Sequence, residues 1–168
     1  MQRPHTRLSP SPPSTLGGRD LHALPAVSLA AAIRNREISV VEVVEAHIAR
    51  VQAVNPHINA VCVERFDAAR AEAGQAQAAV ERGDKLGPFH GVPCTIKELI
   101  AVEGLPWTAG VVARRDVRAT EDAPQVARLR AAGAIILGLT NISESGLWLE
   151  SDNKIYGRTR NPWDTRRM

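Results

Sequence analysis

The sequence predicts an α/β fold in which helices cover a β-sheet. Two short apolar segments, around 92–96 and 134–137, have the composition of buried strands. Between them lie a loop rich in Gly and Pro and a segment with helical spacing, 123–133. The order strand, loop, helix, strand is typical of a βαβ crossover, which places the two strands side by side in one sheet.

Three helices and one strand are expected upstream of this unit. Residues 25–37 predict a first helix, with Pro25 tolerated in its opening turn. Ser39, followed by Glu42 three residues later, forms a capping-box pattern, and the helix that it starts is expected to stop at Asn55-Pro56. The remaining two elements are a short strand at 58–64 and an alanine-rich helix at 66–84 that ends near Gly83.

Two further residues are expected to bound the later helix. Asp122 precedes the helical segment 123–133 and can cap its amino terminus through its carboxylate. Gly133 follows the last helical residue and can close the carboxyl terminus. The sequence thus predicts a helix bounded by Asp122 and Gly133.

Composition argues against several function classes. The 168 residues are 44% hydrophobic, which is enough for one core-bearing domain, and the net charge of +3 is dispersed, so no nucleic-acid partner is expected. Cys62 and Cys94 lack CxxC spacing and the histidines are scattered, so neither a disulfide framework nor a metal site is indicated. There is no GxGxxG and no P-loop, and no cofactor is expected.

The amino-terminal residues 1–23 have the composition of a flexible leader rich in Pro and Ser. They contain no continuous apolar segment of the kind found in secretory signals. No apolar run elsewhere approaches the roughly 20 residues that span a bilayer. We therefore expect a globular body at 24–168 and a cytoplasmic location.

Lys97 is the residue that most needs an explanation. It interrupts the apolar run Gly91 to Ile100, where an unpaired ammonium in a sheet core would be heavily penalised. In one interpretation its stem packs on the core while the ammonium reaches water or meets Glu98 or Glu103. In the other, burial makes a neutral amine available as a general base.

A base needs a nucleophile, and the nearby candidates are weak. Ser143 and Ser145 lie in a segment typical of a capping turn, without a His partner or a G-x-S-x-G elbow, so we interpret them as capping and packing serines. His90, just before the Lys97 strand, is interpreted as a turn residue.

Three separated segments resemble the amidase signature family. They are "GPFHGVPCTIKE", "DAPQVARLRAAGAIILGLTN" and "ESDNKIYGRTRNPWD", in the family's order. The resemblance extends over 24–168 and is strongest to amidases of the fatty acid amide hydrolase type. It implies the amino-terminal part of the amidase signature fold, a mixed β-sheet covered by helices.

The resemblance implies a role for Lys97 as the base of a Ser, cis-Ser, Lys triad that hydrolyses amides through an acyl-enzyme. In the family, both serines follow "NPWD" in a Gly/Ser-rich segment, and none of the serines in this chain matches them. The chain is therefore expected to be truncated before the nucleophile and inactive alone. Its full-length parent would act on a small-molecule amide, and the open part would self-associate or pair with the missing carboxyl-terminal part.

Two alternatives stay open. The A subunit of glutamyl-tRNA amidotransferase is similar, but it usually has Asp-Asn after the lysine, where this chain has Glu98-Leu99, and Lys in place of Leu139. The other alternative is a noncatalytic interaction module that pairs with a separately encoded remainder.

Overall fold

A three-stranded mixed sheet forms the centre of the molecule. The computed structural model describes residues 15–16 and 18–167. The strands β3 (Val61–Glu64), β5 (Ile135–Thr140) and β4 (Pro93–Lys97) lie in that order, with β4 parallel and β3 antiparallel to β5. The predicted α/β fold class and its mixed sheet are confirmed.

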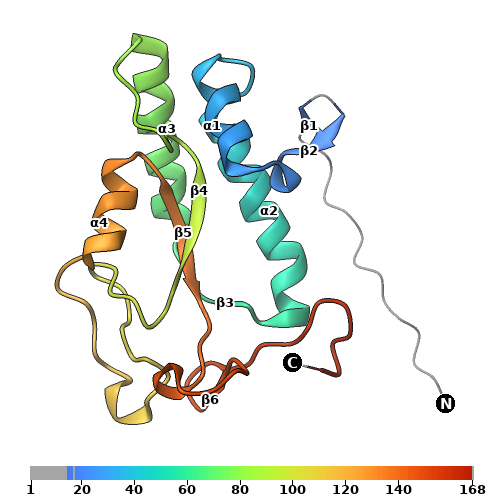
Figure 1. The fold of residues 1–168 in the computed structure, drawn as a ribbon, viewed down its shortest axis with the longest axis vertical. Helices are drawn as coiled ribbons and strands as arrows, with labels where there is room; N and C mark the ends of the chain where they lie inside the picture. The colour runs from blue at the N-terminus through green and yellow to red at the C-terminus, as the bar shows by residue number, and fades with distance from the viewer. Residues whose placement is uncertain (1–14, 17, 168) are drawn as a thin grey trace.

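The predicted βαβ crossover is present. Helix α4 (Pro124–Ala131) connects the parallel strands β4 and β5, and the loop 98–123 leads into it. The register pairs Lys97 with Thr140, so the carboxyl ends of the two strands lie side by side. Figure 1 shows these strand ends facing the lower half of the molecule, where the loops and the later chain segments gather.

The three upstream helices are α1 (Ala26–Arg34), α2 (Val40–Ile58) and α3 (Phe66–Arg82). The capping box is confirmed, because Ser39 Oγ accepts from the Glu42 N–H and the Glu42 carboxylate accepts from the Ser39 N–H. Gly83, at a φ of 77°, ends α3 in the left-handed conformation as predicted.

The predicted end of α2 is wrong by two to three residues. The helix continues through Pro56 to Ile58, and Asn59, whose φ of 52° and ψ of 48° are left-handed, is its C-cap residue. A proline in the last turn removes one N–H donor and crowds the carbonyl four residues earlier, and α2 accommodates it. Asn59 then closes the helix by donating its N–H to the Asn55 carbonyl.

The predicted cap of α4 is also wrong. Ala123 occupies the N-cap position, and no side chain caps the helix. The Asp122 carboxylate instead accepts from the Glu103 N–H at 2.8 Å and from Arg130 Nε at 2.7 Å. Asp122 therefore ties the loop 98–123 to α4. Gly133, at a φ of 90°, follows the helix as expected.

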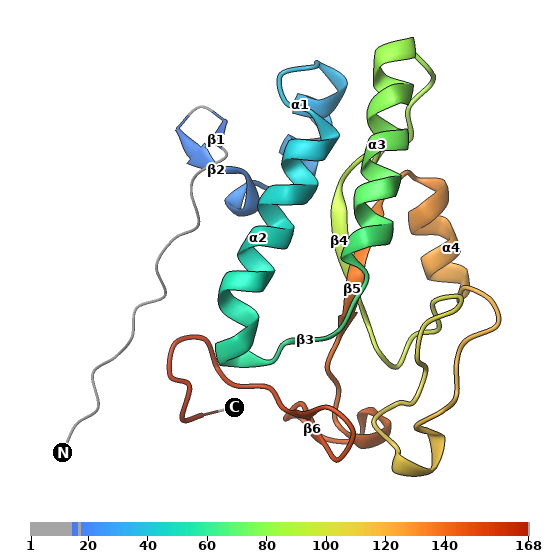
Figure 2. The same cartoon turned by 180° about the vertical axis from the view of Figure 1, so that it is seen from behind.

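Two hydrophobic clusters form the core, and β5 contributes to both. Ile135 and Leu137 pack with α1, α2 and α3, whereas Ile136 and Leu139 pack with α4 and the loop that follows β4. Side chains alternate along residues 135–137, and the register shift between Ile136 and Gly138 places Leu139 on the same side as Ile136, so the two clusters lie on the two faces of the sheet. Figures 1 and 2 show α2 and α4 on either side of the strands, and α3 between them when viewed from behind.

The packed part of the chain begins before Leu24. Strands β1 (Thr15–Leu16) and β2 (Arg19–Asp20) form a small hairpin, followed by the short 3₁₀ helix Leu21–Ala23. Leu21 is buried in the cluster formed by α1 to α3. Residues 1–14 of the expected leader lie outside the described residues.

The chain after β5 contains only short elements. A 3₁₀ turn covers Glu144–Gly146, and strands β6 (Asp152–Asn153) and β7 (Gly157–Arg158) form a tight hairpin. Another 3₁₀ turn, Val112–Arg114, lies in the loop before α4. These segments surround the carboxyl ends of β4 and β5.

Across the described residues, none of the helices has both the length and the apolar character needed to cross a bilayer.

Candidate active site

Lys97 is the last residue of β4, at the carboxyl end of the parallel strand pair. This end of an open α/β sheet is where ligands and catalytic groups usually lie, because the loops that follow the strands converge there. Thr140, the paired residue, ends β5 beside it. The strand that the sequence predicted around Lys97 is confirmed.

The side chain of Lys97 is exposed, which agrees with the interpretation in which its ammonium reaches water and contradicts the one in which the strand buries it. Strand β4 is at the edge of the sheet, and its face that carries Thr95 and Lys97 is open, whereas Ile96 points into the core. Within the described residues the Lys97 ammonium forms no hydrogen bond and no ion pair. The amine is therefore free to meet a group from outside this part of the chain.

Glu98, by contrast, is fully buried, with 0% of its surface exposed. Its Oε1 accepts hydrogen bonds from the Thr108 N–H at 2.6 Å and from the Tyr156 hydroxyl at 3.0 Å. Its Oε2 is buried and has no partner among the described residues. A buried polar atom without a partner costs about 1–3 kcal/mol, so Glu98 is held at a cost to stability.

The donors to Glu98 come from two different segments. Thr108 is fully buried, and its hydroxyl accepts from the Gly110 N–H. Ala109 and Gly110 both have left-handed backbones, with φ of 54° and 71°. A left-handed alanine is strained, and such residues persist where their surroundings hold them. Here the Ala109 carbonyl accepts from the Ser145 N–H at 2.7 Å.

Two asparagines form hydrogen bonds with the backbone of Tyr156. Its N–H donates to Asn153 Oδ1 at 2.8 Å, and its carbonyl accepts from Asn59 Nδ2 at 2.8 Å. Burial is the main cause that raises the pKa of its phenol to about 12, and the Glu98 carboxylate adds to this effect. The hydroxyl therefore remains protonated near neutral pH and can serve as a donor to Glu98.

Two buried asparagines connect this hairpin to the end of β5. Asn153 donates through Nδ2 to Asn141 Oδ1 at 2.9 Å and to the Ile142 carbonyl at 2.8 Å. Asn141 donates in turn to the Gly157 carbonyl and to the Thr159 hydroxyl. The end of the sheet thus carries a connected, mostly satisfied polar network, which is typical of a rigidly built site.

Cys62 on β3 lies near enough to Glu98 and Lys97 for both of them to affect the pKa of its thiol. Burial, the main cause, and the Glu98 carboxylate raise the pKa of the Cys62 thiol to about 12, and the Lys97 ammonium acts in the opposite direction. Burial likewise raises the pKa of Cys94. Both thiols are free in the structure, and neither is a nucleophile near neutral pH.

The turn position of His90 is confirmed, whereas the expected capping role of the serines is wrong. Ser143 stands at the N-cap position of the turn Glu144–Gly146 without capping it through its side chain, and its hydroxyl instead exchanges hydrogen bonds with the backbone of Trp148. Ser145 is exposed, with a left-handed backbone at a φ of 56°. His90 lies in the turn before β4 and bonds the Ala76 carbonyl through Nε2.

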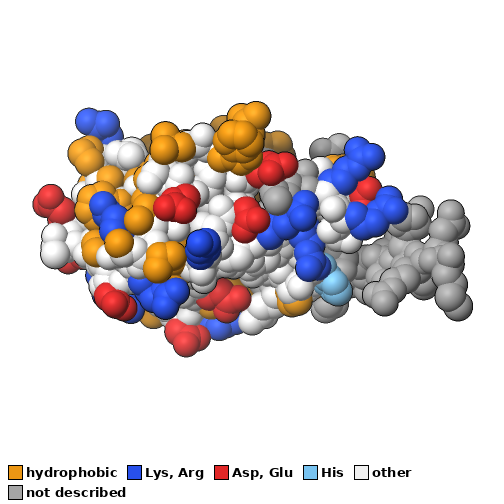
Figure 3. Space-filling view, turned by 90° about the horizontal axis from the view of Figure 1, so that it is seen from below, with side chains coloured by type: hydrophobic (Ala, Val, Ile, Leu, Met, Phe, Trp, Pro, Cys, Tyr) orange, Lys and Arg blue, Asp and Glu red, His pale blue; other side chains and the backbone are white. Residues whose placement is uncertain are grey.

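Large apolar side chains are exposed at the same end of the molecule. Leu147, Trp148 and Leu149 are 84%, 73% and 102% exposed, and Trp163 is 93% exposed. The view from below shows orange side chains standing out from the surface between charged ones (Figure 3). Clustered apolar exposure of this kind is typical of a surface that another polypeptide covers.

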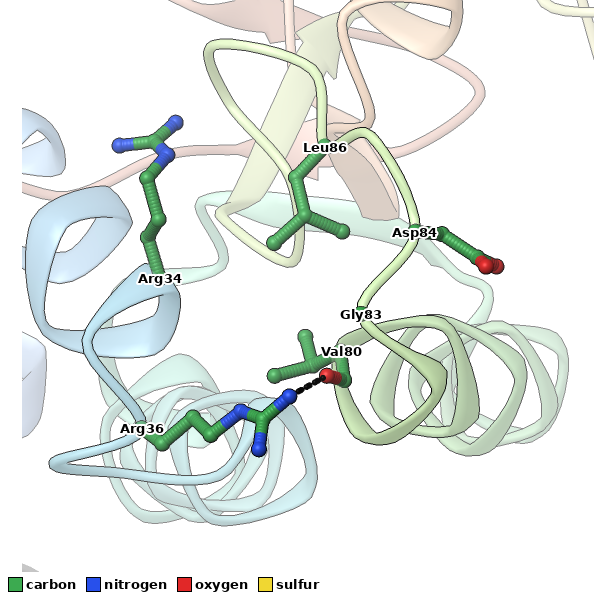
Figure 4. Close-up of a pocket in the computed structure, with 6 residues that line it drawn as sticks. All are labelled: Arg34, Arg36, Val80, Gly83, Asp84 and Leu86. Atoms are coloured by element: carbon green, nitrogen blue, oxygen red, sulfur yellow. Dashed lines mark hydrogen bonds between the residues drawn. The ribbon is translucent and has the colours of Figure 1, made fainter.

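The pocket shown in Figure 4 lies elsewhere. It is a shallow cavity of about 200 Å³ between the α1–α2 connection and the end of α3, before β4 begins. Arg36 donates to the Val80 carbonyl at 2.8 Å and Arg34 to the Gly87 carbonyl at 3.3 Å, so both guanidinium groups are already engaged. Among the described residues no group of three or more His, Cys, Asp or Glu could hold a metal ion.

Lys97 can be identified from the sequence, but the residues that surround Glu98 beside it cannot. The sequence suggests Glu98 as a surface partner for Lys97, yet Glu98 is buried and bonds Thr108 and Tyr156 instead. The one local pattern that indicates part of this site is "SDNKIYGR", in which Asn153 precedes Tyr156 and caps its turn by accepting from the Tyr156 N–H. The pairing of Tyr156 with Glu98 spans 58 residues and leaves no local pattern.

Comparisons with known proteins place the chain in a family. The Amidase family profile matches residues 42–168. Fatty-acid amide hydrolase 2-A of Danio rerio is 48% identical over 153 residues, which are 86% of this chain and 29% of that protein. Acylamidase of Rhodococcus erythropolis is 46% identical over 145 residues, 86% of this chain and 30% of that protein. The A subunit of the glutamyl-tRNA(Gln) amidotransferase of Streptomyces coelicolor is 39% identical over 145 residues, 86% of this chain and 29% of that protein.

The similar solved structures belong to the same kind of enzyme as the relatives found by sequence. A fatty acid amide hydrolase superposes with a TM-score of 0.82 at 25% identity, over 86% of this chain and 26% of that one. A 6-aminohexanoate cyclic dimer hydrolase complexed with substrate superposes with a TM-score of 0.76 at 39% identity, over 88% of this chain and 29% of that one. The chain belongs to the amidase signature family. It spans about 30% of the length of the curated relatives that it matches.

Proposed function

We propose that this chain is the base-carrying part of a serine amidase that hydrolyses carboxylic acid amides, with Lys97 as the general base. The observation that carries the proposal is the position of Lys97. In a chain of the amidase family, its exposed amine stands at the carboxyl end of the central strands, beside a buried polar network and without a partner among the described residues. In this proposal, polypeptide beyond the described residues covers the amine and desolvates it, and the neutral amine then takes a proton from a neighbouring hydroxyl.

In the proposed reaction the remaining groups come from polypeptide beyond the described residues. A nucleophilic serine attacks the amide carbonyl and gives its proton to a bridging serine, whose own proton passes to Lys97. Backbone N–H groups stabilise the negative oxygen of the tetrahedral intermediate. The C–N bond then breaks, the leaving amine takes a proton back along the same route, and water hydrolyses the acyl-enzyme to the carboxylic acid.

The chain's own serines are poorly suited to act as the nucleophile. Ser143 is 4% exposed, and its hydroxyl is already bonded to the Trp148 backbone. Ser145 is exposed but has no His partner in its turn. We therefore propose that the two serines follow residue 168 in a Gly/Ser-rich segment, as the resemblance to the family implies, and that residues 24–168 alone are inactive.

Two observations favour an amide hydrolase over an amidotransferase A subunit. The fatty-acid amide hydrolase and the acylamidase are 48% and 46% identical, whereas the A subunit is 39% identical. Glu98-Leu99 follows the lysine, and Glu98 is integrated in the buried network. The substrate is then a small-molecule amide, and no nucleic acid is bound. The cytoplasmic location stays a prediction from the sequence.

A noncatalytic interaction module is the second candidate, and the exposed apolar side chains favour it. On this interpretation the surface with Leu147, Trp148 and Leu149 pairs with a separately encoded remainder or with a second copy of the chain.

An amide hydrolysis assay separates the two candidates. We expect a polypeptide that contains these 168 residues and the rest of the family domain to release amine from simple acyl amides and anilides. The 168-residue chain alone should release none above the buffer control. A complete polypeptide without any hydrolysis, together with a stable complex between separately encoded parts, would support the interaction module instead.

A further inference from the structure

We propose that Glu98 is a positioning residue for the amide hydrolysis described above. Its buried carboxylate joins the end of β4, which carries Lys97, to the loop at Thr108 and to Tyr156, and so fixes where the Lys97 amine reaches. The inference rests on the proposed function of Lys97. Its two halves, the fixing of β4 and the effect on the reaction, have separate tests.

The contacts of Glu98 place it at the junction of three chain segments. Its N–H donates to the Thr140 carbonyl at 3.0 Å, which extends the pairing of β4 with β5 by one residue beyond Lys97. Its Oε1 accepts from Thr108 at 2.6 Å and from Tyr156 at 3.0 Å. Glu98 therefore contacts β5 through its backbone and both the loop and the hairpin through its side chain.

Both donors are themselves fixed, so the carboxylate is held by a preformed cradle. The Thr108 hydroxyl accepts from the Gly110 N–H at 3.1 Å, and a Cβ on Gly110 would stand 3.1 Å from the Cβ of Asn153. Asn153 in turn accepts from the Tyr156 N–H. The loop and the hairpin therefore lock against each other, and Glu98 is fastened to both of them.

Lys97 has no comparable restraint of its own. Its ammonium makes no hydrogen bond or ion pair within the described residues, and its side chain is exposed. The direction of the side chain then depends on the backbone of residues 96–98. Ile96 is buried in the core on one side of Lys97, and Glu98 is anchored on the other. A small displacement of a reacting group can cost about a hundredfold in rate, so this anchoring matters for a base.

The first half of the test uses amide hydrogen exchange in the 168-residue chain. In Glu98→Ala we expect the N–H groups of Glu98's neighbours Ile100 and Thr108 to exchange at least about tenfold faster than in the wild type. The Ile135 N–H, bonded to the Val92 carbonyl at the other end of the strands, should be unchanged. Glu98→Gln keeps an acceptor oxygen for both donors and should restore most of the protection. Unchanged exchange of Ile100 and Thr108 in Glu98→Ala would overturn the inference.

The second half measures kcat and KM in a complete amidase that contains these residues. We expect Glu98→Ala to lower kcat about 10- to 100-fold with KM changed less than about threefold, and Glu98→Gln to recover kcat to within about fivefold of the wild type. Tyr156→Phe removes one of the two donors, serves if Glu98→Ala fails to fold, and should lower kcat by a smaller factor. Glu121→Ala, at an exposed carboxylate in the loop before α4, is the control.

The outcomes distinguish this inference from the proposed function. An active wild type with an equally active Glu98→Ala would overturn the inference and leave the proposed function intact. Equal losses in Glu98→Ala and Glu98→Gln would also overturn it, because the hydrogen bonds to Oε1 would then not be the cause. An inactive wild type would contradict the proposed function, and the catalytic half of the inference would fall with it.

Discussion

Replacement of Lys97 by methionine is expected to lower kcat for amide hydrolysis about 10²- to 10⁴-fold in a complete amidase that contains these residues, since a positioned general base contributes that much. Methionine keeps most of the length of the side chain and removes the amine. Because the Lys97 side chain is exposed and makes no hydrogen bond or ion pair within the described residues, the thermal unfolding temperature should stay the same. Steady-state kinetics and circular dichroism measure the two effects.

Lys154→Met is the matched control for this change. Lys154 is an exposed lysine in the turn between β6 and β7, and its side chain takes no part in the network around Glu98. We expect its kcat to remain within about twofold of the wild type. A Lys97→Met enzyme that retained more than about a tenth of the wild-type kcat would exclude Lys97 as the base.

Gly138→Ala is expected to destabilise the chain by about 3 kcal/mol, at the upper end of the usual cost of overpacking. A Cβ at Gly138, in the central strand β5, would stand 2.2 Å from the Val63 carbonyl oxygen and 3.3 Å from the Glu64 Cα of β3. Since these are backbone atoms of a paired strand, the clash cannot be relieved by rotating a side chain. Urea unfolding followed by circular dichroism measures the loss.

The same substitution at Gly74 should have the opposite sign. Gly74 lies in the middle of α3, and a Cβ there would meet nothing within 4 Å. Alanine is favoured over glycine in a helix interior by about 1 kcal/mol, so Gly74→Ala should unfold at a higher urea concentration than the wild type. Equal unfolding midpoints for Gly138→Ala and the wild type would show that β3 does not pair closely with β5.

Local signals explain which elements could be predicted from the sequence. Ser39 and Glu42 cap α2 with each other, and Gly83 ends α3 through its own backbone, so each prediction needs only a few neighbouring residues. The end of α2 at Ile58 is missed because a proline in a last turn and a proline that stops a helix look alike in sequence. Asp122 is misjudged because its partner Arg130 lies eight positions away, on the far side of the helix start.

The part of the candidate site that depends on local sequence can be predicted, and the part that depends on tertiary contacts cannot. A lysine within an apolar strand is visible in the sequence, and Lys97 does end β4. The sequence leaves open whether its side chain is exposed or buried, because no local pattern shows that β4 forms the edge of the described sheet. The burial of Glu98 depends on Thr108 and Tyr156, which reach it only through tertiary packing over 10 and 58 residues.

The central claim is that the nucleophile lies outside these 168 residues while Lys97 supplies the base. Intact-mass and peptide measurements after treatment with a fluorophosphonate, which modifies activated serines, test it most directly. We predict one modified serine in a complete amidase polypeptide, located after residue 168, and no modification of the 168-residue chain alone. Stoichiometric modification of Ser143, Ser145 or any other serine within the chain would contradict the claim.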